Sequence, residues 1–183
     1  MLKKYVLAGG PCSGKTEVLQ ALQKRGFYCL NEVARYLIHQ ERNKSGNENF
    51  KPSEDIVMFQ KKLLATQTEW ERDVPSNIEK LFSDRGVIDG IAFLNVNNKE
   101  IFPGLLEAAK KANYSKIFYL DMLKNYSKDE FRQESEEEAR RIHQIIGEVY
   151  KSHDYDLIRI PEMGVEERVE MILKEIKNDD YSI

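Results

Sequence analysis

Apolar residues follow two patterns along the chain. Five short apolar runs, each closed by Gly, Pro, Asn or Asp, alternate with longer segments in which apolar residues recur every three or four positions. The short runs predict buried strands, and the three-to-four spacing predicts amphipathic helices. The predicted strands span residues 4–8, 27–30, 80–84, 116–121 and 157–160. The predicted helices span residues 16–25, 32–41, 53–73, 88–97, 103–112, 135–151 and 165–177.

Local signals refine these boundaries. Gly26 stands where a helix C-cap glycine belongs, and Ser135 with Glu138 has the spacing of a capping box. Residues 43–52 form the most polar stretch, with one glycine and three asparagines. We therefore predict a mobile loop there, and we expect Ser53 to open the long helix that follows.

The order of the elements predicts an α/β fold. A strand, a loop, a helix and a second strand follow one another within the first 30 residues, which is the βαβ signature of a parallel sheet. A chain of 183 residues has the size of one ordinary domain, and no repeat, linker or low-complexity tract divides it. We expect residues 1–183 to form a single domain.

Composition narrows the class of protein. Hydrophobic residues make up 41% and charged residues 32% of the chain, which is typical of globular proteins. The 28 Lys and Arg against 31 Asp and Glu give a net charge of −3, which argues against a nucleic-acid partner. Cys12 and Cys29 form neither a disulfide framework nor a metal-ligand pattern. No apolar run approaches the roughly 18 residues of a membrane span, so we expect a cytoplasmic protein.

The strongest chemical signal directly follows the first predicted strand. The pattern G-x-x-x-x-G-K-[ST] is matched by Gly9, Gly10, Pro11, Cys12, Ser13, Gly14, Lys15 and Thr16. Its glycines let backbone N–H groups wrap phosphate oxygens, and the next helix directs its positive end at them. The lysine reaches the β- and γ-phosphates, and the hydroxyl ligates Mg²⁺. The position between a strand and a helix supports this prediction of a nucleotide-binding loop.

With this loop the chain resembles the P-loop NTPases, and more narrowly the kinase branch that includes nucleoside, nucleotide and ribosylnicotinamide kinases. It resembles in particular the NadR-like AAA-type predicted ATPases or kinases. That resemblance is carried by GGPCSGKT, NEVARYLI, SDRGVIDGIAF, and DEFRQESEEEARRI followed by Tyr150, RIPEMGVEER and a terminal helix. It implies a three-layer fold with a five-stranded parallel sheet and helices on both faces. It also implies a substrate-side helical region at about residues 32–74 and a helical lid at about residues 125–141.

Other P-loop branches carry motifs that this chain lacks. A GTPase has Asn-Lys-x-Asp after a strand, whereas neither Asn43-Lys44 nor Asn98-Lys99 is followed by that aspartate. A motor-type ATPase ends a strand in Asp-Glu, and no predicted strand here does so. The comparison favours a kinase that uses ATP, with GTP left open.

Glu32 follows the second predicted strand, at the edge where ligands bind in such sheets. A carboxylate there can accept the proton of an attacking hydroxyl, and kinases that this chain resembles place an acidic residue at this point. A helix N-terminal glutamate favoured by the helix dipole is the alternative. Arg35, one helical turn later, is predicted either to bind an anionic acceptor group or to pair with Glu32.

Asp84 and Arg85 end the third predicted strand. The pair resembles the acidic-Arg motif of nucleoside and nucleotide kinases. Asp84 is predicted to hold Mg²⁺ and Arg85 to bind an acceptor phosphate or carboxylate. The alternative is a pair that only positions the loop. For Asp89 we favour capping of the next helix over a catalytic use.

Two further groups of polar residues are candidates. Gln60 and Gln67 lie seven residues apart on one face of the long predicted helix, where a solvated face is favoured over a nucleobase contact. Arg132 is our preferred lid cation for the transferring phosphoryl group. Arg140 and Arg141 are equally well explained as helix-surface partners of Glu136 and Glu137.

These signals predict ATP·Mg²⁺-dependent phosphoryl transfer to a small molecule such as a nucleoside, a nucleotide or a pyridine riboside. Lys15, Glu32, Asp84, Arg85 and Arg132 are the predicted catalytic residues, with Thr16 and Asp84 as metal ligands. A nucleotide-binding regulatory module with slow hydrolysis and a protein or lipid partner is the alternative. We expect a monomer or a homodimer.

Overall fold

A computed structural model describes residues 2–48, 50–124 and 135–178. Its strands are β1 (Lys3–Ala8), β2 (Tyr28–Leu30), β3 (Lys80–Asp84), β4 (Lys116–Leu120) and β5 (Leu157–Ile160). They form one parallel sheet in the order β2-β3-β1-β4-β5. The five predicted strands are confirmed, β3 and β5 to the residue. Because every strand is parallel, all five carboxyl ends lie at the same edge of the sheet.

The helices of the described residues also follow the predicted order. They are α1 (Lys15–Lys24), α2 (Val33–Ser45), the 3₁₀ helix η1 (Pro52–Asp55), α3 (Ile56–Arg72), α4 (Asp89–Val96), α5 (Pro103–Lys111), α6 (Glu136–Ser152) and α7 (Val165–Asn178). The predicted capping box at the start of α6 is present, with Ser135 Oγ accepting from the Glu138 backbone N–H at 3.2 Å. Within the part of the chain that the structure describes, no helix is long and apolar enough to cross a bilayer.

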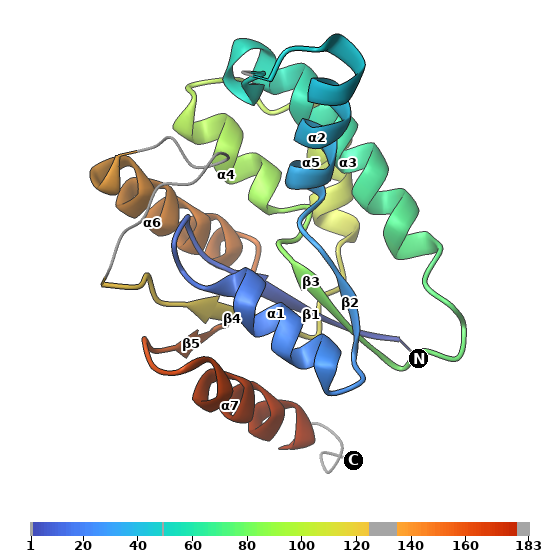
Figure 1. Ribbon diagram of the computed structural model, residues 1–183, viewed down its shortest axis with the longest axis vertical. Coiled ribbons are helices and arrows are strands. Elements are labelled where there is room, and N and C mark those ends of the chain that lie inside the picture. The colour runs from blue at the N-terminus through green and yellow to red at the C-terminus, as the bar shows by residue number, and fades with distance from the viewer. Residues whose placement is uncertain (1, 49, 125–134, 179–183) are drawn as a thin grey trace.

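Two apolar cores lie on opposite faces of the sheet. Side chains alternate along β1, so that Tyr5 and Leu7 pack with α1 and α7, whereas Val6 and Ala8 pack with α4 and α6. Figure 1 shows α1 and α7 on one side of the sheet and α6 on the other. The sheet is therefore the middle of three layers, as predicted.

Two predicted boundaries in the substrate-side region are wrong. Helix α2 continues to Ser45, so the loop that follows is shorter than the predicted 43–52. The long helix begins at Ile56 rather than at Ser53, because the Asp55 side chain accepts from the Met58 backbone N–H at 3.1 Å and caps α3. An aspartate cap satisfies an N-terminal amide, and the polar residues before it form η1 instead.

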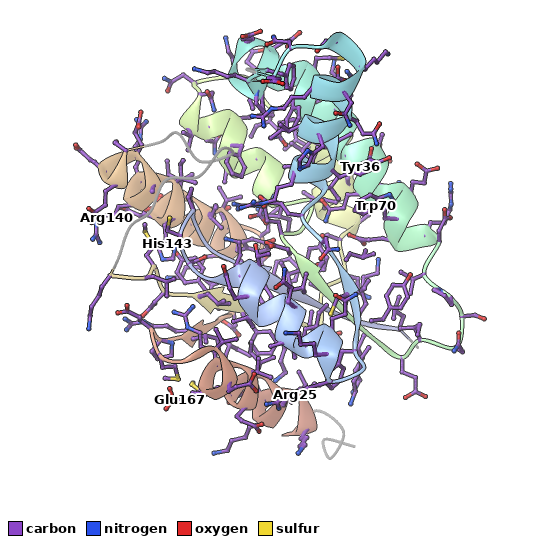
Figure 2. The ribbon with its side chains drawn as sticks, viewed as in Figure 1. Arg25, Tyr36, Trp70, Arg140, His143 and Glu167 are labelled. Carbon is purple, nitrogen blue, oxygen red and sulfur yellow. The ribbon has the colours of Figure 1, made fainter. Side chains whose placement is uncertain are left out.

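Helices α2 and α3 pack against each other beyond the sheet. Their contact includes the rings of Tyr36 and Trp70, whose centroids are 5.1 Å apart (Figure 2). Tyr36 remains 45% exposed in this contact. On the opposite side of the molecule, Arg25 at the end of α1 pairs with Glu166 and Glu170 of α7 at 2.5 Å each.

Candidate active site

The phosphate loop, residues 9–14, joins β1 to α1 at the carboxyl edge of the sheet. Gly14 has a φ of +75°, a conformation that favours glycine, and its carbonyl accepts the first helical hydrogen bond of α1 from Val18 at 3.2 Å. Ser13 Oγ donates to the Gly10 carbonyl at 2.9 Å and closes the loop on itself. The predicted motif therefore has the strand, turn and helix context that a phosphate-binding loop requires.

Lys15 is buried against this loop, with 6% of its surface exposed. Its Nζ donates to the Gly10 carbonyl at 2.8 Å and to Ser13 Oγ at 3.0 Å. Burial, and then the neighbouring Arg85, lower the pKa of Lys15 to about 8, against the opposing effect of Asp84. A phosphate in the loop would give this ammonium group the anionic partner that two neutral oxygens do not provide.

His143 of α6 holds the loop from one side. Its Nδ1 accepts the backbone N–H of Gly10 at 3.0 Å, and the centroid of its ring lies 4.4 Å from that of Tyr119. An added Cβ at Gly10 would lie 2.7 Å from the Cβ of His143, so the contact requires glycine. Burial, and then Lys15, lower the pKa of His143 to about 4. The imidazole is therefore neutral at pH 7 and remains a hydrogen-bond acceptor.

Arg168 of α7 holds the loop from the other side. Its guanidinium is 1% exposed and donates to the Ser13 carbonyl at 2.5 Å, to the Pro161 carbonyl at 2.9 Å and to the Asp121 carbonyl at 3.0 Å. These three carbonyls belong to the phosphate loop and to the segments after β5 and β4. One buried side chain thus ties together three loops at the carboxyl edge.

Asp84 and Thr16 form a candidate magnesium site. Thr16 Oγ1 donates to Asp84 Oδ2 at 3.3 Å, whereas the buried Asp84 Oδ1 has no hydrogen-bond partner in the described part of the chain. An orphaned carboxylate oxygen beside a hydroxyl fits a Mg²⁺ ion, which prefers one or two protein oxygens together with phosphate oxygens and water. Among the described residues, no cluster of three His, Cys, Asp or Glu side chains could hold a metal ion.

Asp84→Asn is expected to stabilise the ligand-free protein, although it should abolish metal binding. Burial, and then Glu32, raise the pKa of Asp84 to about 6, so the folded state binds more protons than the unfolded state between about pH 4 and 6. Stability is therefore lost as the pH rises through that window. The substitution should raise the free energy of unfolding by about 1–3 kcal/mol near pH 7.5 and by much less near pH 4.5.

Urea unfolding of the ligand-free protein at the two pH values measures this effect. Asp73→Asn is the matched control, since the side chain of Asp73 is 60% exposed and should change stability little at either pH. A loss of stability in Asp84→Asn near pH 7.5 would contradict the prediction.

Glu32, Arg85 and Asp89 form one ion-paired group beside the loop. Arg85 Nε donates to Glu32 Oε1 at 2.9 Å, and its Nη1 donates to Asp89 Oδ1 at 3.2 Å and to the Gly9 carbonyl at 3.2 Å. Arg35 Nε donates to the other Glu32 oxygen at 2.9 Å, so the predicted Glu–Arg pair is present. Asp89 is the first residue of α4 and pairs with Arg85, which corrects the prediction that it mainly caps the helix.

Charge balance keeps this group ionised. Burial alone would raise the pKa of Glu32, but the attraction of Arg85, followed by that of Lys15, lowers it to about 2. Burial alone would lower the pKa of Arg85, but the nearby carboxylates, Glu32 first, raise it above its usual value. Glu32 is therefore a carboxylate at any pH near neutral. It is a hydrogen-bond acceptor with little affinity for a proton.

A cavity of about 530 Å³ connects the loop with this group. Its polar lining includes Lys15, Thr16, Glu32, Arg35, Arg85, Asp89 and Arg141. Its apolar lining includes Ile38, Phe50, Ile56, Phe59, Leu63 and Phe93. The guanidinium of Arg85 lies 5.0 Å from the centroid of the Phe93 ring. The volume and a wall that combines apolar side chains with convergent polar groups are typical of small-molecule sites.

The structure corrects the prediction for two glutamines. Gln60 and Gln67 are 3% and 4% exposed, so they do not lie on a solvated helix face. Gln60 lines the cavity, whereas Gln67 Nε2 donates to the Arg85 carbonyl at 3.3 Å behind it. Burial follows from the packing of α3 against α4, which hydropathy along α3 does not reveal.

The predicted lid is described only from residue 135 onward. Arg132 lies outside the described residues, as do residues 125–134 of the predicted lid. Arg140 pairs with Glu136 at 2.6 Å, one of the two predicted uses of that arginine, whereas Arg141 lines the cavity. The sequence predicted no role for His143, Tyr150 or Arg168, although Tyr150 and Arg168 fall within the resemblance, because their partners are distant along the chain.

A family model described as an AAA domain matches residues 4–168 of the chain. No curated protein matches it. Among solved structures, deoxyadenosine kinase from M. mycoides with bound dATP is 16% identical, with a TM-score of 0.68, and the match covers 97% of this chain and 100% of that one.

Two further solved structures are similar. Thymidylate kinase from Candida albicans is 13% identical over 98% of this chain and 92% of that one, with a TM-score of 0.70. The NadR protein in complex with NR is 13% identical, with a TM-score of 0.73, over 97% of this chain but only 50% of that one. At these identities the similarity establishes a fold of the P-loop kinase type.

Proposed function

The chain belongs to the AAA domain family, and we propose that it transfers the γ-phosphoryl group of ATP·Mg²⁺ to a hydroxyl of a small molecule. One observation carries the proposal: a single cavity is lined both by Lys15 and Thr16 of the phosphate loop and by the Glu32–Arg85–Asp89 group. Hydrolysis or nucleotide sensing needs no binding site for a second substrate beside the loop. A buried, ion-paired acceptor side is what transfer to a second substrate requires.

On the nucleotide side, the loop amides and Lys15 bind the β- and γ-phosphates. Thr16 Oγ1 and Asp84 hold Mg²⁺, which supplies charge neutralisation at the transferring group. Arg141 lines the cavity and, in this proposal, adds positive charge near the transfer. Arg132 keeps its predicted role as the lid cation of residues 125–141.

On the acceptor side, Glu32 orients the attacking hydroxyl by accepting its hydrogen bond. The low pKa of Glu32 makes it a weak base, which is sufficient because a loose phosphoryl-transfer transition state leaves the proton on the nucleophile until late. Arg85 binds a polar or anionic group of the acceptor. Its Nη2 nitrogen has no hydrogen-bond partner among the described residues. The apolar wall of the cavity fits the ring of a nucleoside, a nucleotide or a pyridine riboside.

The test is ATP consumption by the purified protein against a panel of nucleosides, nucleotides and nicotinamide riboside, with mass spectrometric detection of the product. We expect at least one acceptor to stimulate ADP release and to gain the mass of one phosphoryl group. Slow ADP release that no acceptor stimulates, with ATP binding intact, would replace this proposal with the regulatory module. Parallel assays with GTP decide the preferred nucleotide.

A further inference from the structure

Tyr150 of α6 places its hydroxyl in the interior, at the start of α4. Its side chain is fully buried, and its hydroxyl donates to Asp89 Oδ2 at 2.6 Å. A buried tyrosine hydroxyl usually finds a hydrogen-bond partner. Here the partner is a carboxylate that is itself 3% exposed, which makes the bond charge-assisted and short.

This bond is the first of a chain that ends in the cavity. Asp89 Oδ1 accepts from Arg85 Nη1 at 3.2 Å, and Arg85 Nε donates to Glu32 Oε1 at 2.9 Å. The backbone N–H of Gly86 is a further donor to Asp89 Oδ2, at 3.0 Å. Asp89 is thus held by three donors, and together with the Gly9 carbonyl it positions Arg85 Nη1.

Tyr150 stands at the end of this series of hydrogen bonds that is away from the cavity. Arg85, Glu32 and Asp89 line the cavity, whereas Tyr150 does not. The hydrogen bonds of its hydroxyl lead to the cavity through Asp89, and from Asp89 to Arg85. Buried networks of this kind transmit the loss of one member to the next, because each bond polarises and orients its neighbour.

Helix α6 contacts both halves of the site. Tyr150 reaches Asp89 at one end of the helix, and His143, two turns earlier, accepts the N–H of Gly10 in the phosphate loop. Helix α6 therefore contacts both the phosphate loop, through His143, and the acceptor side, through Tyr150. The two halves of the site are held in register by one element.

We propose that Tyr150 is a positioning residue, which through Asp89 holds the Arg85 guanidinium in the orientation that receives the acceptor. The inference rests on the proposed function and adds a residue that no pattern around the phosphate loop indicates. It concerns acceptor binding and transfer, and it leaves nucleotide binding unchanged.

Tyr150→Phe tests this inference, because it removes one oxygen and keeps the ring that packs in the core. We expect kcat/KM for the acceptor to fall about 10-fold or more, with the Kd for ATP changed less than about twofold. Tyr155→Phe is the matched control. Tyr155 packs against Tyr150 with ring centroids 6.1 Å apart, but its hydroxyl donates to the Ala112 carbonyl at 2.7 Å, away from the cavity. Equal losses in the two variants, or parallel loss of ATP affinity, would overturn the inference.

A double-mutant cycle separates positioning from general loosening of the core. If Tyr150 acts only through Asp89, Tyr150→Phe should reduce kcat/KM much less in an Asp89→Asn background than in the wild type. An undiminished effect in that background would show that Tyr150 does not act through Asp89. Thermal unfolding of each variant confirms that the proteins compared are folded.

A third measurement does not depend on any kinase activity. In nuclear magnetic resonance spectra of the ligand-free protein, the Arg85 Nε–H signal should be protected from solvent exchange in the wild type and in Tyr155→Phe. It should exchange faster in Tyr150→Phe. If no acceptor is ever phosphorylated, this result still decides whether Tyr150 positions Arg85, and an unchanged exchange rate would refute it.

Discussion

Lys15→Ala is expected to lower kcat for phosphoryl transfer at least ~10²-fold, the cost typical of removing one preorganised electrostatic contact in a transition state. The ammonium group is already buried at the loop, where it donates to the Gly10 carbonyl and to Ser13 Oγ. Transfer of its bonds to phosphate oxygens needs little reorganisation, because the side chain is in place before the nucleotide binds. Alanine removes the charge and leaves the loop amides.

Steady-state turnover with the identified acceptor measures this loss, with the Kd for ATP determined separately. Lys24→Ala is the control, since Lys24 ends the same helix, α1, and is exposed. Wild-type turnover of ATP by the Lys15→Ala protein would refute both the kinase proposal and the regulatory alternative.

The pKa of Lys15 adds a test of its state before binding. At about 8 in the ligand-free protein, the group is largely protonated at pH 7 and loses its proton as the pH rises through 8. Bound phosphates favour the charged form and should raise the pKa again. ATP binding near pH 8 should therefore take up protons, which calorimetry in buffers of different ionisation enthalpy detects. The uptake should be absent in Lys15→Ala.

Glu32→Gln is expected to lower kcat about 10²-fold, at the lower end of the range for a group that acts on the reacting hydroxyl. The amide keeps the shape of the side chain but removes the charge that attracts Arg85 and Arg35. Because the pKa of Glu32 is about 2, the wild-type rate should show no loss that is attributable to Glu32 between pH 5 and 8. Glu32→Asp keeps the charge and should retain part of the activity.

Glu71→Gln provides the control for loss of an ion pair as such. Glu71 is 12% exposed and pairs with Lys4 at 2.6 Å, outside the cavity lining. Its substitution should affect stability more than kcat. A Glu32→Gln protein that turns over the true acceptor at the wild-type rate would remove Glu32 from the proposed mechanism.

Much of the fold and part of the site could be predicted from local patterns. The short apolar run before Gly9 and the spacing of glycine, lysine and threonine determine a strand, a turn and a helix over a dozen residues, and these local preferences agree with one another. The strand ends also located Glu32, Asp84 and Arg85, because parallel strands bring their carboxyl ends to one edge. A helix boundary was missed where two residues could start the same helix: Asp55, and not Ser53, caps α3.

What local patterns could not determine is which polar side chains become buried. Gln60 and Gln67 look solvated along α3, but α4 packs over them. Asp89 looks like a helix cap, but Arg85 and Tyr150 surround it. In each case the deciding neighbour lies on another element, and burial depends on how the elements pack.

The sequence by itself determined the order of strands and helices, the phosphate loop and the acidic and basic residues at the strand ends. These depend on interactions within a few residues. Only the tertiary structure decided that Tyr150 reaches Asp89 across 61 positions, and that His143 reaches Gly10 across 133. Such contacts depend on the strand order and on the packing of α6, which no short stretch of sequence encodes. The acceptor side of the site is therefore a product of the assembled fold.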